Sequence, residues 1–403
     1  MPHPCTHRDP ALASLIDAAV PPSIELRRRL HRHPEVMFEE RQTSAAIKEV
    51  LRSLEIPFVE DLAGGTGILA HLAGGDGSPV ALRADMDALP IEERTSVAWK
   101  STVPGRMHAC GHDGHVSVLV GAARVLREIA RRTGLPRPVT LVFQPGEEGG
   151  GGGRMMVEEG ALDGSRIGPP VRRIYGLHGW PMLGLGQVAT RPGPMLAAAD
   201  AFEVVIEGEG GHAALPHLVR NPVLAAGAIA ASLPMLVATE VTAVDAAIVT
   251  PTMLRAGDAF NVIPQTARLA GTIRTLREET RQRLHRAIVE RCEGMAAAHR
   301  CRAEVRIREG YPITVNDPET CGHFDEVLAG AIGLERVEAF PAPTMGAEDF
   351  AYYGRVVPAC FFALGLQAVD GPRVPPLHSP FFDFEDRAIP TGIAAMTSLA
   401  LAG

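Results

Sequence analysis

The sequence predicts an α/β layer into which a smaller α+β domain of the ferredoxin-like type is inserted. Up to about residue 190, apolar runs typical of strands alternate with helical patterns, and this alternation favours an α/β layer. From Ala201 the order of elements changes to β-α-β-β-α-β, which is typical of a ferredoxin-like sandwich. The 403 residues are enough for two domains. We therefore expect one domain from residues 1-195 and 309-403, and an inserted one from residues 196-308.

The elements of the first domain follow from hydrophobic periodicity. A helix is expected over Val116–Arg131, because apolar residues recur there on one helical face. Short apolar runs bounded by turn residues predict strands. These runs are Val80–Ala84, Val139–Phe143, Arg173–Leu177 and Cys360–Leu364, and a final helix is expected from Ile389.

The inserted domain begins with Phe202–Ile206, which alternates apolar and polar residues as a half-buried strand does. The segments that follow predict a helix, two strands, a helix and a strand. Their bounds are Pro222–Leu236, Ala246–Leu254, Thr266–Arg274, Glu278–Arg300 and Arg302–Arg308. This domain could close over the polar edge of the first one.

Polar side chains follow the predicted strands of the first domain. In open parallel sheets, ligands bind beyond the carboxyl ends of the strands. A lone histidine is usually structural, but residues that share such an edge are candidates for one site. The residues at this edge are Asp85 and Asp87, Glu147 and Glu148, His178 and, after a loop, His378.

The stretch MHACGHDGH, residues 107-115, gathers three histidines, a cysteine and an aspartate just before the predicted helix. A structural zinc knuckle would need two more thiolates or imidazoles at short spacing, so any remaining ligands come from distant segments. We expect Cys110 and His112, two positions apart in an extended turn, to face the same way, and the thiolate can then bridge two cations. A capped helix start with solvated histidines is the alternative.

Two pairs of carboxylates accompany this motif. Glu147 and Glu148 would normally indicate a solvated acidic turn. After a buried strand we expect them to point apart, so that one binds metal and the other takes a proton from a metal-activated water. Asp85 and Asp87 share one face and are either ligands or carboxylates that orient a histidine ligand, with a plain loop as the alternative.

Three residues of the inserted domain offer further chemistry. His212 lies in the glycine-rich EGEGGHAALPH, Asn261 in FNVIP and Arg274 in GTIRT. Together they supply an imidazole, an amide and a guanidinium, and the two-pronged donors of arginine suit a carboxylate. A solvated surface is the alternative for each of them.

Composition argues against several functional classes. A formal net charge of −8 and short arginine clusters give no basic face for nucleic acid. The sequence contains neither GxxxxGK[ST] nor GxSxG, which argues against a phosphate-binding P-loop and a serine hydrolase. Asn221–Thr239 is uncharged, but Pro222, Pro234 and many alanines argue against a membrane span.

The expected compartment is the cytoplasm. The start MPHPCTHRDP lacks a basic region followed by an apolar core, so we expect no signal peptide. The cysteines at positions 5, 110, 292, 301, 321 and 360 form neither a CxxC pair nor a dense framework. This spacing fits a reducing compartment better than secretion.

Many of these segments resemble blocks of the M20 metallopeptidases, and more closely of their amidohydrolase branch of hippurate hydrolases, aminoacylases and auxin-conjugate hydrolases. The blocks follow the family's order over roughly residues 27 to 390. The resemblance implies a zinc-peptidase-like catalytic domain with an inserted ferredoxin-like lid. The blocks are RRRLHRHPEVMFEE, LRADMDALPIEE, MHACGHDGH, FQPGEEGGGGG, YGLHGWP, GGHAALPH, FNVIP, GTIRT, MGAEDFAYY and LHSPFFDFEDRAIP.

The resemblance implies a centre of two divalent metal ions and a general base that matches Glu147. A thiolate favours zinc, while related enzymes often work with manganese, cobalt or nickel, so the metal is left open. The implied ligands are Cys110 as the bridge, with His112, Glu148, His178 and His378.

One departure from the wider family is typical of the amidohydrolase branch. Elsewhere in the family an HxD motif supplies a histidine ligand, and an aspartate bridges the metals. Here Asp85 occupies the position of that histidine, and Cys110 occupies that of the bridge. This leaves Asp85 and Asp87 as carboxylates that orient the ligands.

The implied activity is hydrolysis of an N-acyl amino acid, hippurate-like or N-acetyl, by a metal-activated water. His212 matches a lid histidine that polarises the scissile carbonyl, in some relatives across a dimer, while Asn261 and Arg274 match substrate-binding positions. A homodimer or homotetramer through the lid domain is expected. N-acetyl-diaminopimelate deacetylase and carbamoyl amino acid hydrolase are the alternatives. A non-catalytic metal-binding or sensor protein would not need Glu147, since metal binding alone requires no base.

Overall fold

The structure, a computed structural model, describes residues 7–402, and the chain divides into two compact units. Unit 1 contains the residues up to Met195, Val315–Ala342 and the residues from Asp349 onward. Unit 2 contains Leu196–Thr314 and Pro343–Glu348. Most of the segment used to judge the signal peptide, including Cys5, lies outside the described residues.

Unit 1 is built on an eight-stranded sheet in the order β1-β2-β4-β3-β5-β16-β6-β15. The central strands β4, β3, β5 and β16 run parallel, and β3 and β4 are buried along their whole length. Such burial explains why these strands are continuous apolar runs in the sequence, as the α/β prediction requires. The bounds are β1 Phe58–Leu62, β2 Gly67–Leu72, β3 Val80–Asp85, β4 Val139–Gln144, β5 Arg173–Gly184, β6 Val188–Thr190, β15 Val337–Ala339 and β16 Ala359–Gln367.

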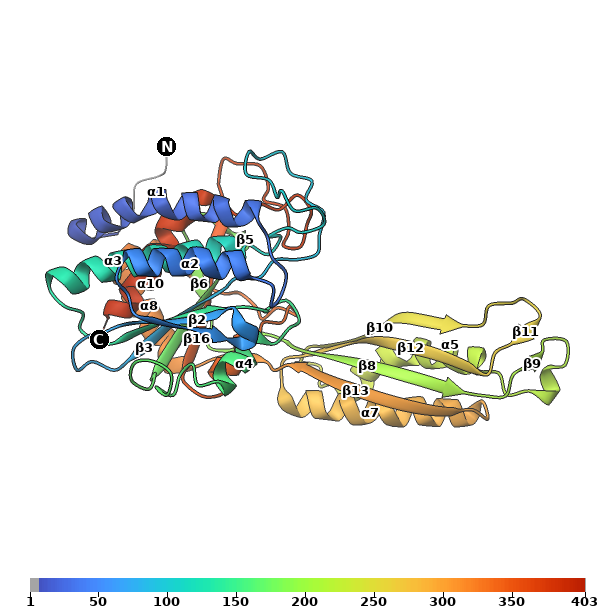
Figure 1. Cartoon of the computed structure of the whole chain (residues 1–403). Helices are drawn as coiled ribbons and strands as arrows, with labels where there is room; N and C mark the ends of the chain where they lie inside the picture. The colour runs from blue at the N-terminus through green and yellow to red at the C-terminus, as the bar shows by residue number, and fades with distance from the viewer. Residues whose placement is uncertain (1–6, 403) are drawn as a thin grey trace. The chain divides into compact units, whose positions relative to one another are not determined.

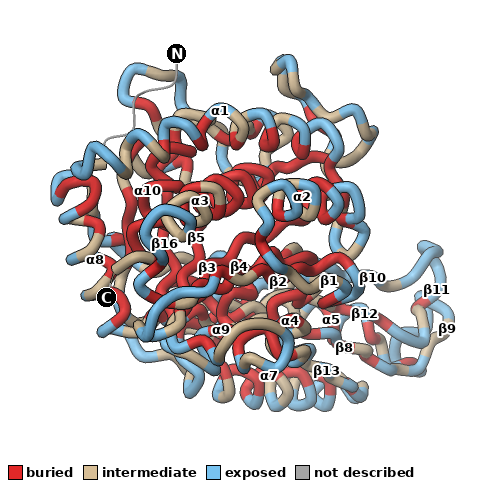
Figure 2. The backbone as a smooth tube through the Cα atoms, turned by 60° about the vertical axis from the view of Figure 1, so that its left-hand side comes forward, coloured by how far each residue is buried: buried red, intermediate tan, exposed pale blue. Residues whose placement is uncertain are grey.

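Helices cover both faces of this sheet, and Figure 1 shows α1, α2 and α3 on one side and α4 on the other. Helix α3 lies between the sheet and α1, and it is among the most deeply buried segments in Figure 2. Its first four turns are buried almost completely, and most of its charged residues gather in the last two turns. The bounds are α1 Pro10–Arg32, α2 Arg41–Ser53, α3 His112–Arg132, α4 Gly152–Glu158, α8 Pro318–Ile332, α9 Ala351–Gly354 and α10 Ile389–Leu401.

Unit 2 has the predicted order of elements, β-α-β-β-α-β. Four antiparallel strands form a sheet in the order β10-β12-β8-β13, and helices α5 and α7 pack on it around one apolar core. A small two-stranded sheet, β9 with β11, lies at one end of this sheet (Figure 1). The bounds are β8 Ala198–Glu207, β9 Gly211–His212, α5 Pro222–Ser232, α6 Leu236–Glu240, β10 Ala247–Ala256, β11 Val262–Ile263, β12 Thr266–Thr275, α7 Glu278–Ala298 and β13 Arg302–Tyr311. Short strands β7 Gly193–Leu196 and β14 Thr314–Asn316 lie where the chain passes between units.

The uncharged segment of unit 2 is a core element of that unit. Pro222–Glu240 is long and apolar enough to cross a membrane by length and composition alone. A 3-10 turn at Leu233–Met235, which contains Pro234, separates α5 from α6. Ala225, Ile229 and their neighbours on the inner face belong to the core of unit 2. The inner face of this segment is therefore used for packing within the unit.

Candidate metal centre

The predicted metal ligands of unit 1 lie close together at the carboxyl ends of the parallel strands. Cys110 belongs to two clusters at once, one with His112 and His178 and the other with Glu148 and His378. Within each cluster the potential ligand atoms lie within 4.8 Å of one another. The Sγ of Cys110 is 3.3 Å from Nε2 of His178, and Nε2 of His378 is 3.2 Å from Oε1 of Glu148. One sulfur atom therefore connects two sets of donors.

The histidine rings are oriented by backbone carbonyls. Nδ1 of His112 lies 2.8 Å from the carbonyl oxygen of Asp87, and Nδ1 of His178 lies 2.9 Å from that of Gly179. A ring that donates from Nδ1 keeps a lone pair on Nε2, which is the usual arrangement in a metal-binding histidine.

Two buried atoms of this centre match the donors that a transition metal needs. Among the residues that the structure describes, the buried Nε2 of His112 forms no hydrogen bond, and the buried Oε1 of Glu148 lies 3.2 Å from Nε2 of His378. A buried polar atom without a partner is costly, and metal coordination would offset that cost. Sulfur, nitrogen and oxygen donors together fit zinc and its neighbours better than magnesium or calcium.

Glu147 and Glu148 lie in a turn after β4, so the expected extended geometry is wrong. Both carboxylates place an oxygen within 4.8 Å of a ring nitrogen of His112, and they do not point apart. The turn is held by Asp87, whose two carboxylate oxygens accept the backbone N–H groups of Glu147 at 3.0 Å and of Glu148 at 2.9 Å. Asp87 thus fixes both glutamates and, through its carbonyl, His112.

Asp85 has both carboxylate oxygens engaged by protein groups. Arg83 donates to one oxygen at 2.6 Å, and Nδ1 of His115 lies 2.6 Å from the other. Burial raises the pKa of Asp85, but the charges of His112, Arg83 and His115 outweigh it and hold that pKa well below its usual range. The other ring nitrogen of His115 accepts the backbone N–H of Gly179 at 2.8 Å. Asp85 therefore connects α3 to the strand that carries His178.

A left-handed glycine, and not an extended turn, brings Cys110 and His112 to the same side. Gly111 has φ of 87° and precedes His112, the first residue of α3. Phe384 packs directly on this loop, because a Cβ at Gly114 would lie only 2.4 Å from its ring. The motif therefore needs glycine at two positions for different reasons, backbone conformation at Gly111 and close packing at Gly114.

A buried ion network behind the motif was missed by the sequence analysis. Nδ1 of His31 is 2.8 Å from Asp113, and Arg27 contacts Asp383 at 2.5 Å and Asp386 at 2.8 Å. Helix α1 thereby joins the start of α3 to the loop that follows His378. The signal was the basic run RRRLHRH on a helix whose Arg27 and His31, one turn apart, are both buried.

His108, the first histidine of the motif, belongs to none of the ligand clusters found among the described residues. It is buried, and burial lowers its pKa to about 3.

Glu40 is a second residue that the sequence analysis missed. Its carboxylate accepts the N–H of Gly146 at 2.9 Å, and burial raises its pKa to about 7. Glu40 therefore holds the turn that carries Glu147 and Glu148 without offering a ligand.

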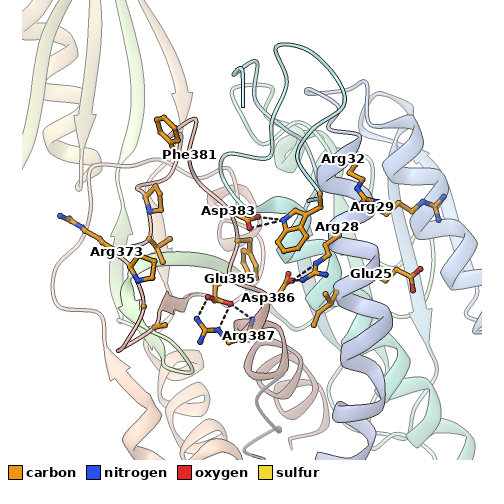
Figure 3. Close-up of a pocket in the computed structure, with 18 of the residues that line it drawn as sticks. Glu25, Arg28, Arg29, Arg32, Arg373, Phe381, Asp383, Glu385, Asp386 and Arg387 are labelled. Atoms are coloured by element: carbon orange, nitrogen blue, oxygen red, sulfur yellow. Dashed lines mark hydrogen bonds and ion pairs between the residues drawn. The ribbon is translucent and has the colours of Figure 1, made fainter. Parts of the chain in front are cut away.

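A hollow of about 1150 Å³ lies between α1 and the loop that carries His378 (Figure 3). None of the proposed metal ligands lines it. Its walls are tied by internal pairs, Arg28 with Asp386, Trp99 with Asp383 and Arg387 with Glu385, at the dashed lines of Figure 3. The pair of Arg28 with Asp386 joins the loop to α1, and the pair of Trp99 with Asp383 joins it to a second loop.

Of the three candidates in unit 2, His212 and Asn261 are neighbours. His212 pairs with Val262 in the small two-stranded sheet, and the carbonyl of Asn261 accepts the N–H of Ala213 at 3.0 Å. Both side chains are exposed. Arg274 lies elsewhere, near the end of β12 and opposite Ala199 of β8.

The register of β12 keeps Arg274 far from His212 within one copy of unit 2. The two-stranded sheet that contains His212 lies near Thr266, where β12 begins. Arg274 is eight positions further along the same strand. Eight residues of antiparallel strand span roughly 27 Å. Within one copy of this unit, His212 and Arg274 therefore lie near opposite ends of β12.

An α/β layer with thiolate, imidazole and carboxylate donors at the carboxyl ends of its parallel strands defines a metal-dependent hydrolase. Residues 81–402 match the model of Peptidase family M20/M25/M40, and the chain belongs to this family. The predicted membership, including the amidohydrolase branch, is confirmed by the family match and by the relatives.

The relatives match over nearly the whole chain. An IAA-amino acid hydrolase of Arabidopsis thaliana is 40% identical over 383 residues, which is 94% of this chain and 84% of the relative. An N-acetylcysteine deacetylase of Bacillus subtilis is 36% identical over 379 residues, 94% of this chain and 96% of the relative. The solved YXEP protein of Bacillus subtilis, a dinuclear metal binding peptidase of the M20 family, has a TM-score of 0.81 and 33% identity and covers 96% of this chain and 98% of its own.

Replacement of Gly114 by alanine tests the packing of the metal-binding loop. The new Cβ would meet the Phe384 ring, and we expect a loss of about 1–3 kcal/mol in the free energy of unfolding, as for an overpacked core. Urea unfolding at fixed metal concentration measures this loss. Gly227→Ala is the control, because no atom lies within 4 Å of a Cβ there. Equal stability of the two variants would contradict the packing argument.

Proposed function

We propose that this protein is a binuclear metal-dependent amidohydrolase that cleaves N-acyl amino acids to a carboxylic acid and a free amino acid. The observation that carries the proposal is the position of Cys110 in two ligand clusters, with the carboxylate of Glu147 beside them. The relatives support the substrate class, since one is named for hydrolysis of an IAA-amino acid and another for deacetylation of N-acetylcysteine.

In this proposal two divalent metal ions would be held by the two clusters: one by His112 and His178 and the other by Glu148 and His378, with the Cys110 thiolate available to both. Zinc suits the thiolate best, and manganese, cobalt and nickel are the metals to test beside it.

The chemistry divides between the metals and the chain. Divalent ions at this centre would lower the pKa of a water molecule and polarise the acyl carbonyl. Glu147, with only 6% of its surface exposed, takes the proton from the attacking water and returns it to the leaving amine. Asp87 keeps Glu147 in place by accepting its backbone N–H. Because Glu147 is shielded from water, its electrostatic interactions within the site are stronger than they would be in solution.

His212 is assigned to the oxyanion that forms on the acyl carbon, and Asn261 to the substrate beside it. The ends of unit 2 that carry His212 and Arg274 are too far apart to meet one small substrate from a single copy. We assign His212 and Asn261 to the centre of a second copy. Arg274 is assigned to its own chain, because it lies opposite Ala199, close to where the chain enters unit 2.

The surface of unit 2 supports the homodimer or homotetramer that this assignment needs. Strand β10 is an edge of the sheet, and it exposes Ile248, Met253 and Leu254. Leu224 and Met235 on the neighbouring helical segment are exposed as well. An exposed edge strand with apolar side chains is a template for pairing with another chain.

Arg274 is assigned to the free carboxylate of the substrate. Its guanidinium is half-buried and forms no hydrogen bond or ion pair with the residues described, while burial lowers its pKa. The nearby Asp200 is already occupied by Arg281 and His285. A half-buried guanidinium without a protein partner is suited to a carboxylate.

The cytoplasm remains the predicted compartment. The five cysteines that the structure describes are all free thiols. Free thiols fit a reducing compartment.

Neither alternative substrate class, diaminopimelate or carbamoyl conjugates, is favoured by the names of the two relatives.

The first test joins metal content to activity. Purified protein should contain about two divalent ions per chain and release free amino acid, detected with ninhydrin, from acetyl, benzoyl or longer-chain acyl conjugates. Glu147→Gln should keep its metal and lose turnover by about 10² or more, because only the base is removed. Glu148→Gln is the matched control and should lose metal as well. Parental turnover by Glu147→Gln would refute the assignment of the base.

A mixed-dimer experiment tests whether His212 acts across copies. Glu147→Gln and His212→Ala should each be inactive alone, the second mainly through kcat. Unfolded together in equal amounts and refolded, they should recover roughly a quarter of the parental active sites, because each mixed dimer contains one site with an intact base and an intact partner histidine. Recovery is measured as kcat per chain at fixed metal. No recovery, with dimers formed, would place His212 on its own chain.

Arg274→Ala tests recognition of the carboxylate. The parental enzyme should prefer an N-acyl amino acid over its carboxamide, and the variant should lose that preference while it keeps its metal. The measurement is kcat/KM for both substrates on both proteins. Equal cleavage of acid and carboxamide by the parental enzyme would remove this role from Arg274.

A further inference from the structure

A second cavity of unit 1 lies at the opposite edge of the sheet from the metal centre. It has a volume of about 420 Å³. Arg137 lies just before β4, Arg172 and Arg173 lie at the start of β5, and His323 comes from α8. The metal ligands follow the carboxyl ends of these strands, and the three arginines come before or at the amino ends.

Three arginines line this cavity against two carboxylates, Glu319 and Glu326, and neither carboxylate forms a close ion pair with Arg137. Arg137 is only 6% exposed, and within residues 7–402 its guanidinium has no recorded hydrogen bond or ion pair. Arg173 reaches Glu319 only at 4.0 Å, and the Glu319 side chain is 89% exposed. The pKa of Arg137 is lowered first by burial and then by the charge of Arg173. A buried cation without a counter-ion is strongly unfavourable.

The backbone holds Arg137 in place. Its loop, Leu135 to Pro138, is fixed by two prolines and by hydrogen bonds from Gly75 to the carbonyl of Leu135 at 2.8 Å and from Gly77 to that of Pro136 at 3.1 Å. A Cβ at Gly74 would lie 2.0 Å from the carbonyl oxygen of Arg137, so the two loops touch. The guanidinium therefore stays in the cavity because its backbone has little freedom to move away.

Two more polar groups lie beside the arginines: the buried Nε2 of His323, which forms no hydrogen bond among the described residues, and the buried hydroxyl of Tyr175, which faces Arg173. Tyr175 is two positions after Arg173 on β5, which places both on the same face of the strand. Guanidinium groups with an imidazole and a hydroxyl are the donors that bind a tetrahedral oxyanion.

We propose that this cavity binds a phosphate dianion, either free or as the phosphoryl group of a small metabolite. Arg137, Arg172 and Arg173 supply the charge, and His323 and Tyr175 supply further hydrogen bonds. Arg173 and the proposed ligand His178 are five residues apart on β5, roughly 17 Å along the strand, so the anion is separate from the substrate of the metal centre. This inference does not depend on the proposed amidohydrolase activity.

Phosphate titration of the metal-loaded protein tests the proposal, by calorimetry and by thermal unfolding against chloride at equal ionic strength. The parental protein should bind phosphate in the cavity and show a raised Tm, because a ligand of the folded state stabilises it. Arg137→Met should bind at least about tenfold more weakly there, since it loses the buried charge and keeps the apolar stem. Arg131→Met, an exposed arginine of α3 outside the cavity, is the matched control and should behave as the parent.

The same variants separate this cavity from the metal centre, which is another place where phosphate can bind. Binding at the metals would persist in Arg137→Met, so an equal response of parent and variant would overturn the proposal. Arg172→Ala changes an exposed side chain and gives a second readout if Arg137→Met does not fold; it too should weaken binding. Glycerol phosphate in place of phosphate shows whether an ester is accepted, and either form binding in the cavity supports the proposal. Neither form raising the parental Tm above chloride would refute it.

Discussion

One sulfur atom shared by two sets of donors is the constraint on which the rest of unit 1 depends. Cys110 lies in a loop, and its neighbours in the two clusters come from the start of α3, from β5, from the turn after β4 and from the loop after β16. These segments are remote in sequence. They meet only because parallel strands bring their carboxyl ends to one edge of a sheet. A change in the register of β5 or in the turn after β4 would separate donors that must stay within a few ångströms.

Carboxylates behind the donors maintain this arrangement. Asp87 joins His112 to the glutamate turn, and Asp85 joins Arg83 to His115. Both aspartates are buried, and each has its oxygens satisfied by N–H donors, which removes the cost of an unpaired buried charge. Further out, Arg27 and its carboxylate partners connect α1 to the loop of His378. The centre is therefore oriented by ion pairs that lie behind the ligand residues.

The central strands, and the edge at which the polar residues gather, could be predicted from the sequence. Buried parallel strands leave an uninterrupted apolar run, and the polar residues come right after it. The sequence was not sufficient for α1, whose helical pattern is obscured by Pro21 and Pro22. The backbone conformation of the metal-binding motif could not be predicted either, since the sequence is compatible with both a left-handed and an extended Gly111. The separation of His212 from Arg274 depends on the register of β12, which hydrophobic alternation alone does not determine.

Strand β5 runs between a region suited to cations and a region suited to an anion. Near its carboxyl end, His178 and the unpaired Nε2 of His112 form a place for cations, and at its amino end Arg173 and the unpaired Arg137 form a place for an anion. Each set of buried polar atoms lowers the stability of the chain by itself, and a bound ion offsets that loss. The two ions act about 17 Å apart, so simple charge attraction between them is weak in a solvated protein. Stabilisation by one ion should therefore add to stabilisation by the other, and any departure from additivity would have to pass through β5 itself.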